Sequence, residues 1–158
     1  MNPDIPRANT DSLFYLDDLH AGDQFFSGEH ALDEAQIKSF AAQFDPQPFH
    51  LDDEAAKATM FGGFAASGWH TAALTMRLMV GGGMRLAGGI IGAGGDISWP
   101  KPTRPGDTLH VESEVVSVTP SRSRPDRGMV VVRSETRNQR DDVLQLQIFK
   151  LVVPRRPG

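Results

Sequence analysis

Residues 44–53 read FDPQPFHLDD and place an acid and an imidazole close together in a segment rich in proline. Asp45 and His50 are five positions apart, with Pro46 and Pro48 between them. A carboxylate and an imidazole that face one water molecule can exchange protons with it, which is general acid–base chemistry. In a straight strand, five positions would put the two side chains on opposite faces. This chemistry therefore requires a bent segment, and proline-restricted turns can supply the bend.

The segment before this motif, LDEAQIKSFAAQF at 32–44, has the signals of an α-helix. Asp33 is expected to cap it, with Gln36 three residues later as in a capping box. Apolar residues recur at helical spacing, at Ile37, Phe40, Ala41 and Phe44. Pro46 disfavours the α conformation at Asp45, so the helix should end there. The alternative to a catalytic role is that Asp45 is only the turn residue that stops this helix.

The rest of the chain supplies one further long helix and a series of strands. Residues 69–79 (WHTAALTMRLM) are apolar on nearly every side, as in a buried helix, and glycines follow at 81–83. Segments rich in β-branched residues then predict strands at 96–99, 108–118, 129–138 and 143–153. Earlier, a strand is expected within 22–31 and a short helix over 53–59. Helices early and consecutive antiparallel strands late predict an α+β domain, with the buried helix against one curved sheet.

Length and composition exclude several classes of protein. The 158 residues favour one domain, expected over 13–153 with loosely held tails at 1–12 and 154–158. The net charge of −4 argues against nucleic-acid binding, which usually requires a basic surface. There is no cysteine, which excludes disulfides, thiolate metal sites and a cysteine nucleophile, and suits the reducing cytoplasm that we expect.

One stretch, residues 58–76, carries no formal charge and approaches membrane-spanning length. It contains glycines, threonines, a serine and a histidine, which suit a packed interior better than lipid. The N-terminus, MNPDIPRANTDS, has acids and prolines where a signal peptide would have a basic end and an apolar run. We therefore expect no membrane association.

The order of these elements, together with DPQPFH, ASGWH and RPGD, resembles the MaoC-like dehydratases, the (R)-specific enoyl-CoA hydratases and their relatives of the hot-dog fold. That family's signature is Asp, Asn, Pro, an aliphatic residue and His, with Asp and His five apart. The matching positions here, with Gln in place of Asn and Phe in place of the aliphatic residue, are Asp45, Gln47, Pro48, Phe49 and His50. The resemblance covers about residues 13–153 and implies a single hot-dog domain, an antiparallel sheet wrapped around a long central helix.

The resemblance implies a hydro-lyase that reversibly adds water to the 2,3-double bond of an enoyl thioester, as from enoyl-CoA to 3-hydroxyacyl-CoA in fatty acid metabolism. Asp45 and His50 would act on the water. The backbone N–H of Gly68, at the start of the central helix, would donate to the thioester oxygen as it gains negative charge. Gln47 would contact the substrate. Coenzyme A or an acyl carrier protein would enter as part of the substrate, with no other cofactor and no metal.

One position departs from the family pattern. Family hydratases carry a serine eight residues after this glycine, which orients the catalytic aspartate, and here that position is Met76. Thr75 and Thr71 point about 100° and about 140° away from Met76 around a helix, so neither replaces the serine. We therefore expect Met76 to line the acyl pocket, and Asp45 to be held by a backbone amide or a bound water.

Two other functions compete with hydration. A hot-dog thioesterase would direct water at the thioester carbonyl, and a non-catalytic acyl-thioester-binding subunit would keep the fold without turnover. In any of these cases we expect a homodimer or a higher even-numbered assembly, because hot-dog relatives pair their sheets edge to edge and strand edges would otherwise stay exposed.

Other polar residues allow two interpretations each. A metal site of His50, Asp52 and His70 is conceivable by residue type, but its spacing matches no familiar ligand pattern. His70 is expected to be a helix residue that faces the interior. Arginines could meet coenzyme A phosphates or simply be solvated loop residues, and they are Arg104, Arg122, Arg124 and Arg127.

Overall fold

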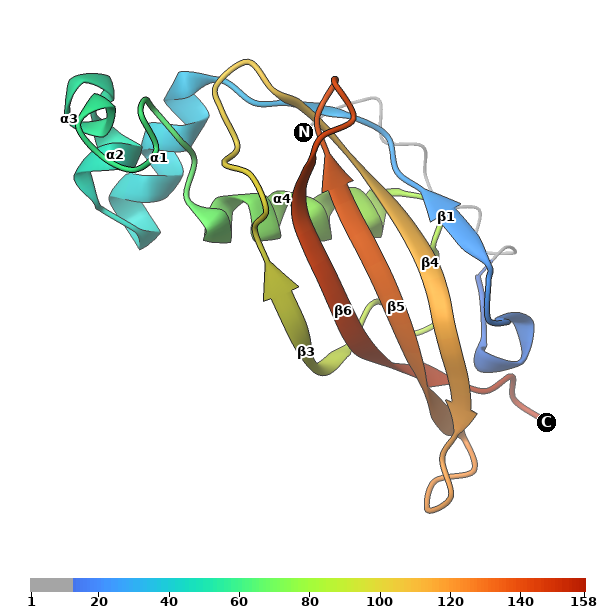
Figure 1. Ribbon diagram of the computed structural model, residues 1–158. Helices are drawn as coiled ribbons and strands as arrows, with labels where there is room; N and C mark the ends of the chain where they lie inside the picture. The colour runs from blue at the N-terminus through green and yellow to red at the C-terminus, as the bar shows by residue number, and fades with distance from the viewer. Residues whose placement is uncertain (1–12) are drawn as a thin grey trace.

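The computed structural model describes residues 13–158, so the tail expected at 1–12 lies outside the described residues. One antiparallel sheet runs in the order β1-β4-β5-β6-β3, and β2 also pairs with β4. The strands are β1 (Gln24–Phe26), β2 (His30–Ala31), β3 (Gly92–Ser98), β4 (Thr108–Pro120), β5 (Arg127–Arg137) and β6 (Val143–Pro154). Figure 1 shows them as a curved sheet with β3 at one edge and β1 at the other. The predicted α+β class is confirmed.

The long strands form because their residues alternate between the covered and the open face of the sheet. In β5, every second residue is buried, which is the pattern of a strand with one face against a core. The register of β4 against β5 shifts between Val115 and Ser117, and such a bulge bends a strand. β3 starts earlier than the predicted 96–99, within a glycine run. A side chain at Gly95 would overlap the backbone of Ile148 on β6, so the close strand pairing there requires glycine.

Helix α4 (Gly68–Gly81) lies across one face of the sheet, as the pattern of residues 69–79 predicts. Leu74, Leu78 and Met79 point into the core that this helix shares with the sheet. Valines from β4 and β5 complete that core, among them Val111, Val115, Val130 and Val132. No helix within residues 13–158 combines the length and hydropathy needed to cross a membrane.

Three shorter helices gather near the N-terminal end of α4 (Figure 1): α1 (Glu34–Phe44), α2 (Pro48–Leu51) and α3 (Asp53–Lys57). The side chain of Asp33 caps α1 by accepting from the backbone N–H of Gln36 at 2.8 Å, as predicted. α1 ends at Asp45, also as predicted. The segment after α1 contains one turn of helix, α2, which begins at Pro48. Proline suits this position because the first residue of a helix donates no N–H within the helix.

Two residues of the segment expected as a tail, 154–158, contact the first residues of the described region. Arg155 pairs with Asp17 at 3.0 Å, and Arg156 pairs with Asp18 at 2.5 Å. Both aspartates belong to a 3-10 turn at Leu16–Asp18. These contacts join the end of the chain to the beginning of the described region.

Candidate active site

The turn between α1 and α2 brings Asp45 and His50 together. Oδ2 of Asp45 lies 3.2 Å from Nε2 of His50. The imidazole is almost completely buried, with 3% of its residue surface exposed. Asp45 is the C-cap of α1, and His50 lies within the single turn of α2, so the bend between the two helices produces the convergence that a straight strand could not.

The contact made by Nδ1 of His50 shows which nitrogen of the imidazole carries a hydrogen. Nδ1 lies 2.7 Å from the backbone carbonyl oxygen of Ala65. A carbonyl only accepts, so Nδ1 carries a hydrogen and donates it. In a neutral imidazole, Nε2 would then have no hydrogen, and its lone pair would face the carboxylate oxygen of Asp45. A contact of 3.2 Å between two acceptors requires a proton between them, so the pair shares one.

Asp45 has two further donors. Gln47 Nε2 donates to Oδ1 at 2.5 Å, and the hydroxyl of Ser67 donates to Oδ2 at 2.7 Å. Burial raises the pKa of Asp45, but these two hydrogen bonds and the nearby His50 outweigh it and leave the pKa below its usual value. Asp45 is therefore held as a carboxylate.

The Ser67 contact corrects the expectation that a backbone amide or water would hold Asp45. Ser67 is the N-cap of α4 and also accepts from the backbone N–H of Trp69 at 3.3 Å. The hydroxyl comes from the residue directly before Gly68 and not from Thr71 or Thr75 within the helix. The signal was present, since serine is a favoured N-cap residue. Gln47 contacts Asp45, and its predicted contact with substrate stays a prediction.

Gly68 is the first residue of α4, where backbone N–H groups have no partner within the helix. Among residues 13–158 its N–H has no hydrogen-bond acceptor. A Cβ at Gly68 would lie 2.8 Å from the ring of Trp99, so a side chain there would displace the indole. The position thus combines a free donor, the positive end of a helix dipole and close packing that only glycine permits.

A cavity of about 190 Å³ joins His50 to Gly68. Its lining residues are His50, Phe61, Ala66, Gly68, Thr71, Trp99, Lys101, Pro102 and Thr103. The cavity is therefore lined both by the imidazole of the Asp45–His50 pair and by a free amide at a helix N-terminus. Proton transfer beside a developing oxyanion requires this combination.

Met76 does not line this cavity, contrary to our expectation. It lies five residues after Thr71, which faces the cavity, and five residues rotate about 140° around a helix. Its side chain consequently points away from the sheet and is 42% exposed.

The other polar residues singled out in the sequence lie outside the cavity. His70 is buried, as expected, and stacks on Phe40 with ring centroids 4.5 Å apart. Burial and the nearby His30 lower the pKa of His70 to about 4. Arg104 donates to the backbone carbonyls of Phe61, Gly63 and Phe64 and so holds the loop between α3 and α4. The β4–β5 loop that carries Arg122 and Arg124 lies at the far end of the sheet from α1–α3 (Figure 1).

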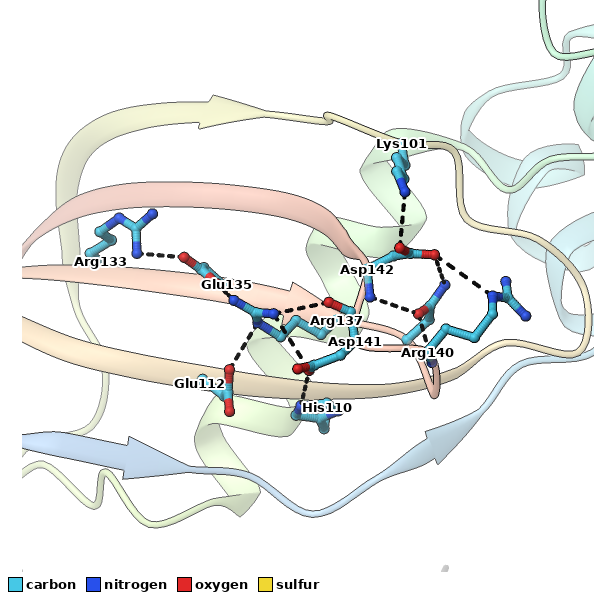
Figure 2. Close-up of polar contacts among 10 residues, drawn as sticks. Lys101, His110, Glu112, Arg133, Glu135, Arg137, Arg140, Asp141 and Asp142 are labelled. Atoms are coloured by element: carbon cyan, nitrogen blue, oxygen red, sulfur yellow. Dashed lines mark hydrogen bonds and ion pairs between the residues drawn. The ribbon is translucent and has the colours of Figure 1, made fainter.

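One cluster elsewhere has the residue types of a metal site. Ligand atoms of His110, Glu112 and Asp141 lie within 4.8 Å of one another. Figure 2 shows, however, that Arg137 occupies this cluster, with Nε 2.9 Å from Glu112 and Nη1 3.5 Å from Asp141. The guanidinium already neutralises the carboxylates, so the cluster is an ion-pair network. The three residues of the metal site considered in the sequence, His50, Asp52 and His70, form no such group in the described part of the chain.

The chain is similar to several known proteins in sequence and in structure. Residues 20–138 match the model of the MaoC like domain family. The crystal structure of a MaoC-like dehydratase from Rhodospirillum rubrum is 60% identical, with a TM-score of 0.90 over 92% of this chain and 99% of that one. A Bacillus subtilis protein, YdeM, is 33% identical over 129 residues, which are 80% of this chain and 89% of that protein. An (R)-hydratase from Pseudomonas aeruginosa is 24% identical, covering 90% of this chain and 86% of its own, and shares the fold with a TM-score of 0.70.

These matches confirm the predicted hot-dog fold, with the sheet curved around α4. The family match spans α1–α4 and the strands up to the end of β5. It therefore includes every residue of the cavity, as well as Asp45 and Ser67. The chain belongs to the MaoC-like dehydratase family.

Proposed function

We propose that this protein is a hydro-lyase that reversibly adds water to the 2,3-double bond of an enoyl thioester, with enoyl-CoA as the substrate. The observation that carries the proposal is the Asp45–His50 pair, 3.2 Å apart, beside a cavity that reaches the free amide of Gly68. The family supports a dehydratase or hydratase in general. The thioester substrate is the specific part of the proposal.

The one proton that Asp45 and His50 share allows both proton transfers of the reaction. In hydration, the carboxylate of Asp45 takes a proton from water as the oxygen bonds to C3, and Nε2 of His50 delivers the shared proton to C2. Afterwards the carboxyl group of Asp45 is protonated and the imidazole is neutral, and proton transfer between them restores the starting state. The reverse sequence removes water, because the same two groups exchange roles.

Gly68 stabilises the intermediate charge in this scheme. As water adds to C3, electron density moves to the thioester oxygen, which becomes an enolate. The amide of Gly68 and the N-terminal end of α4 favour negative charge at that position before the reaction starts. No metal and no cofactor other than the thioester's own carrier is part of the proposed chemistry.

We also propose that the active unit is a homodimer or a higher even-numbered assembly. On α4, three large apolar residues spaced by seven and four positions share one exposed face, and they are Trp69 (60% exposed), Met76 (42%) and Val80 (61%). The outer edge of β3 pairs with no strand among residues 13–158. A second copy that covers the stripe and extends the sheet would remove both exposed surfaces.

The test is turnover of trans-2-butenoyl-CoA by the purified protein, followed by enoyl absorbance and by free thiol. Loss of absorbance without thiol release supports hydration, whereas thiol release would identify a thioesterase. Ligand-induced stabilisation without either change would identify a non-catalytic binder. The Ser67 contact favours catalysis over binding alone, because it supplies the hydroxyl that Met76 cannot.

A further inference from the structure

The covered face of the sheet changes from apolar to polar as it approaches the cavity. Far from the cavity, the cross-strand neighbours are Val132 and Phe149. Nearer to it, they are Ser134 with Gln147 and then Thr136 with Gln145. Thr136 and Gln145 are completely buried, where an alkyl pocket would be expected to have aliphatic side chains.

These buried groups are joined to α4 by hydrogen bonds. Thr75 on α4 shares a hydrogen bond of 2.6 Å with Thr136 on β5. Gln145 donates to Thr75 at 3.2 Å and accepts from the indole N–H of Trp99 at 2.9 Å. The last contact fixes Trp99 against Gly68, at the wall of the cavity. The indole is thus held from behind by a polar network.

The polar character continues into the cavity itself at Thr71 and Thr103. Both line the cavity, both are almost completely buried, and their hydroxyl oxygens lie 2.8 Å apart. Two hydroxyls have two hydrogens and four lone pairs, and their mutual contact uses one of each. Neither hydroxyl has another partner among residues 13–158, so the pair retains one donor and three acceptor sites. A buried pair with unused capacity favours a ligand that carries its own polar atom.

The cavity is also small. Its volume is about 190 Å³. Pockets for larger ligands are typically about 300–1,000 Å³. Phe61 and Trp99 contribute large aromatic side chains to its lining.

We propose that the site selects a short acyl group that carries a hydroxyl or another hydrogen-bonding oxygen, which binds to the Thr71–Thr103 pair. The inference rests on the proposed function, since it assigns the substrate class of the same site. A hydrocarbon chain would leave the remaining donor and acceptor sites of the two hydroxyls unused.

The test compares two substrates that differ only in a terminal hydroxyl or methyl group, 5-hydroxy-trans-2-pentenoyl-CoA and trans-2-hexenoyl-CoA. We expect kcat/KM to favour the hydroxylated substrate by about tenfold or more, since sites built to hydrogen-bond a hydroxyl reject analogues that lack it. The double variant Thr71→Val/Thr103→Val removes both hydroxyls together, so neither is left as a buried group without its partner. This variant should lose the preference.

Matched controls separate this effect from general disturbance of the core. Ser113 and Ser134 form another buried hydroxyl pair, also 2.8 Å apart, away from the cavity. Ser113→Ala/Ser134→Ala should keep the preference, and Thr71→Ser/Thr103→Ser, which retains both hydroxyls, should keep it too. Thermal unfolding of each variant shows whether it is folded.

Binding of the saturated analogues, 5-hydroxypentanoyl-CoA and hexanoyl-CoA, is measured by calorimetry and needs no turnover. Tighter binding of the hydroxylated analogue without hydration of any enoyl-CoA would remove the hydratase proposal and keep the polar acyl site. Hydration with equal or greater preference for trans-2-hexenoyl-CoA would overturn the inference and keep the hydratase. An unchanged preference in a folded Thr71→Val/Thr103→Val protein would also overturn it.

Discussion

The hydroxyl of Ser67 donates to Oδ2 of Asp45 over 2.7 Å, although the two residues are 22 positions apart. The same serine begins α4 as its N-cap. The start of the central helix is therefore fixed to the carboxylate that would serve catalysis. Because Gly68 follows directly, one short segment positions both the oxyanion donor and the acid–base pair.

Replacing Ser67 with glycine should separate these two roles, because glycine is nearly as good an N-cap but has no hydroxyl. A hydrogen bond to a charged group contributes about 1.5–3 kcal/mol, so we expect kcat to fall roughly 10- to 100-fold. Loss of the donor should also raise the pKa of Asp45 and move the acid limb of the kcat/KM profile to higher pH. Ser67→Thr keeps a hydroxyl and should keep both. An unmoved acid limb in a folded Ser67→Gly protein would show that this contact does not tune Asp45.

Asp45→Asn and His50→Ala should each lower the rate of hydration by several orders of magnitude while the protein stays folded. The two groups share one proton, so the double variant should be little slower than either single variant. Glu54→Gln, an exposed carboxylate on α3, is the control and should hydrate at the wild-type rate. Near wild-type turnover by either single variant would remove that residue from the mechanism.

Met76→Lys should convert the assembly to monomers, because it places a charge in the apolar stripe that we propose a second copy covers. Val116→Lys is the control, since Val116 is 49% exposed on β4 and lies outside the stripe. It tests whether a lysine at any exposed apolar position would dissociate the assembly. Sedimentation velocity should give a dimer or larger even-numbered species for wild type and Val116→Lys. A monomeric wild type with full activity would contradict the proposed assembly, and an unchanged Met76→Lys would exclude the stripe as the interface.

The low pKa of His70, about 4 in the folded protein against 6.5 ordinarily, should make the protein less stable in acid. Between these values the unfolded chain binds the proton more readily, so the free energy of unfolding falls as the pH falls from 6.5 towards 4. At pH 5 the loss from this one group is about 2 kcal/mol.

His70→Phe keeps a ring to stack on Phe40 and removes the titration. Urea unfolding at pH 7.5 and pH 5 should show a smaller difference between the two pH values for this variant than for wild type. Equal differences would mean that His70 titrates normally in the folded state.

The sequence predicts the elements whose signals are local. α1 was expected from Asp33 to Asp45 because a cap, a periodic apolar face and a proline mark its length, and α4 and the three long strands follow the same logic. For β3 the sequence predicts only residues 96–99, because the glycines before them give no alternating pattern. Its first residues are a strand only because Gly95 lets the backbone approach Ile148, a contact that local sequence does not encode.

The site is predictable only where its residues belong to a local sequence motif. The Asp45–His50 motif and Gly68 carry recognisable spacing, and the structure brings His50 and Gly68 to one cavity, with Asp45 in contact with His50. The Ser67 contact, the Thr71–Thr103 pair and the position of Trp99 depend on segments that meet only after folding. Met76 does not line the cavity because the orientation of α4 against the sheet decides which side chains face it, and the family pattern does not encode that orientation.

Arg104 links the loop that carries Phe61 to the connection between β3 and β4. Its planar guanidinium spans several backbone carbonyls at once, a geometry that lysine cannot reproduce. Trp99 and Lys101 belong to the same connection, directly after the edge strand that we propose a second copy extends. Two walls of the cavity are thus mechanically coupled to the strand at the proposed subunit boundary. Association of two chains at this strand would then help to set the width of the substrate site.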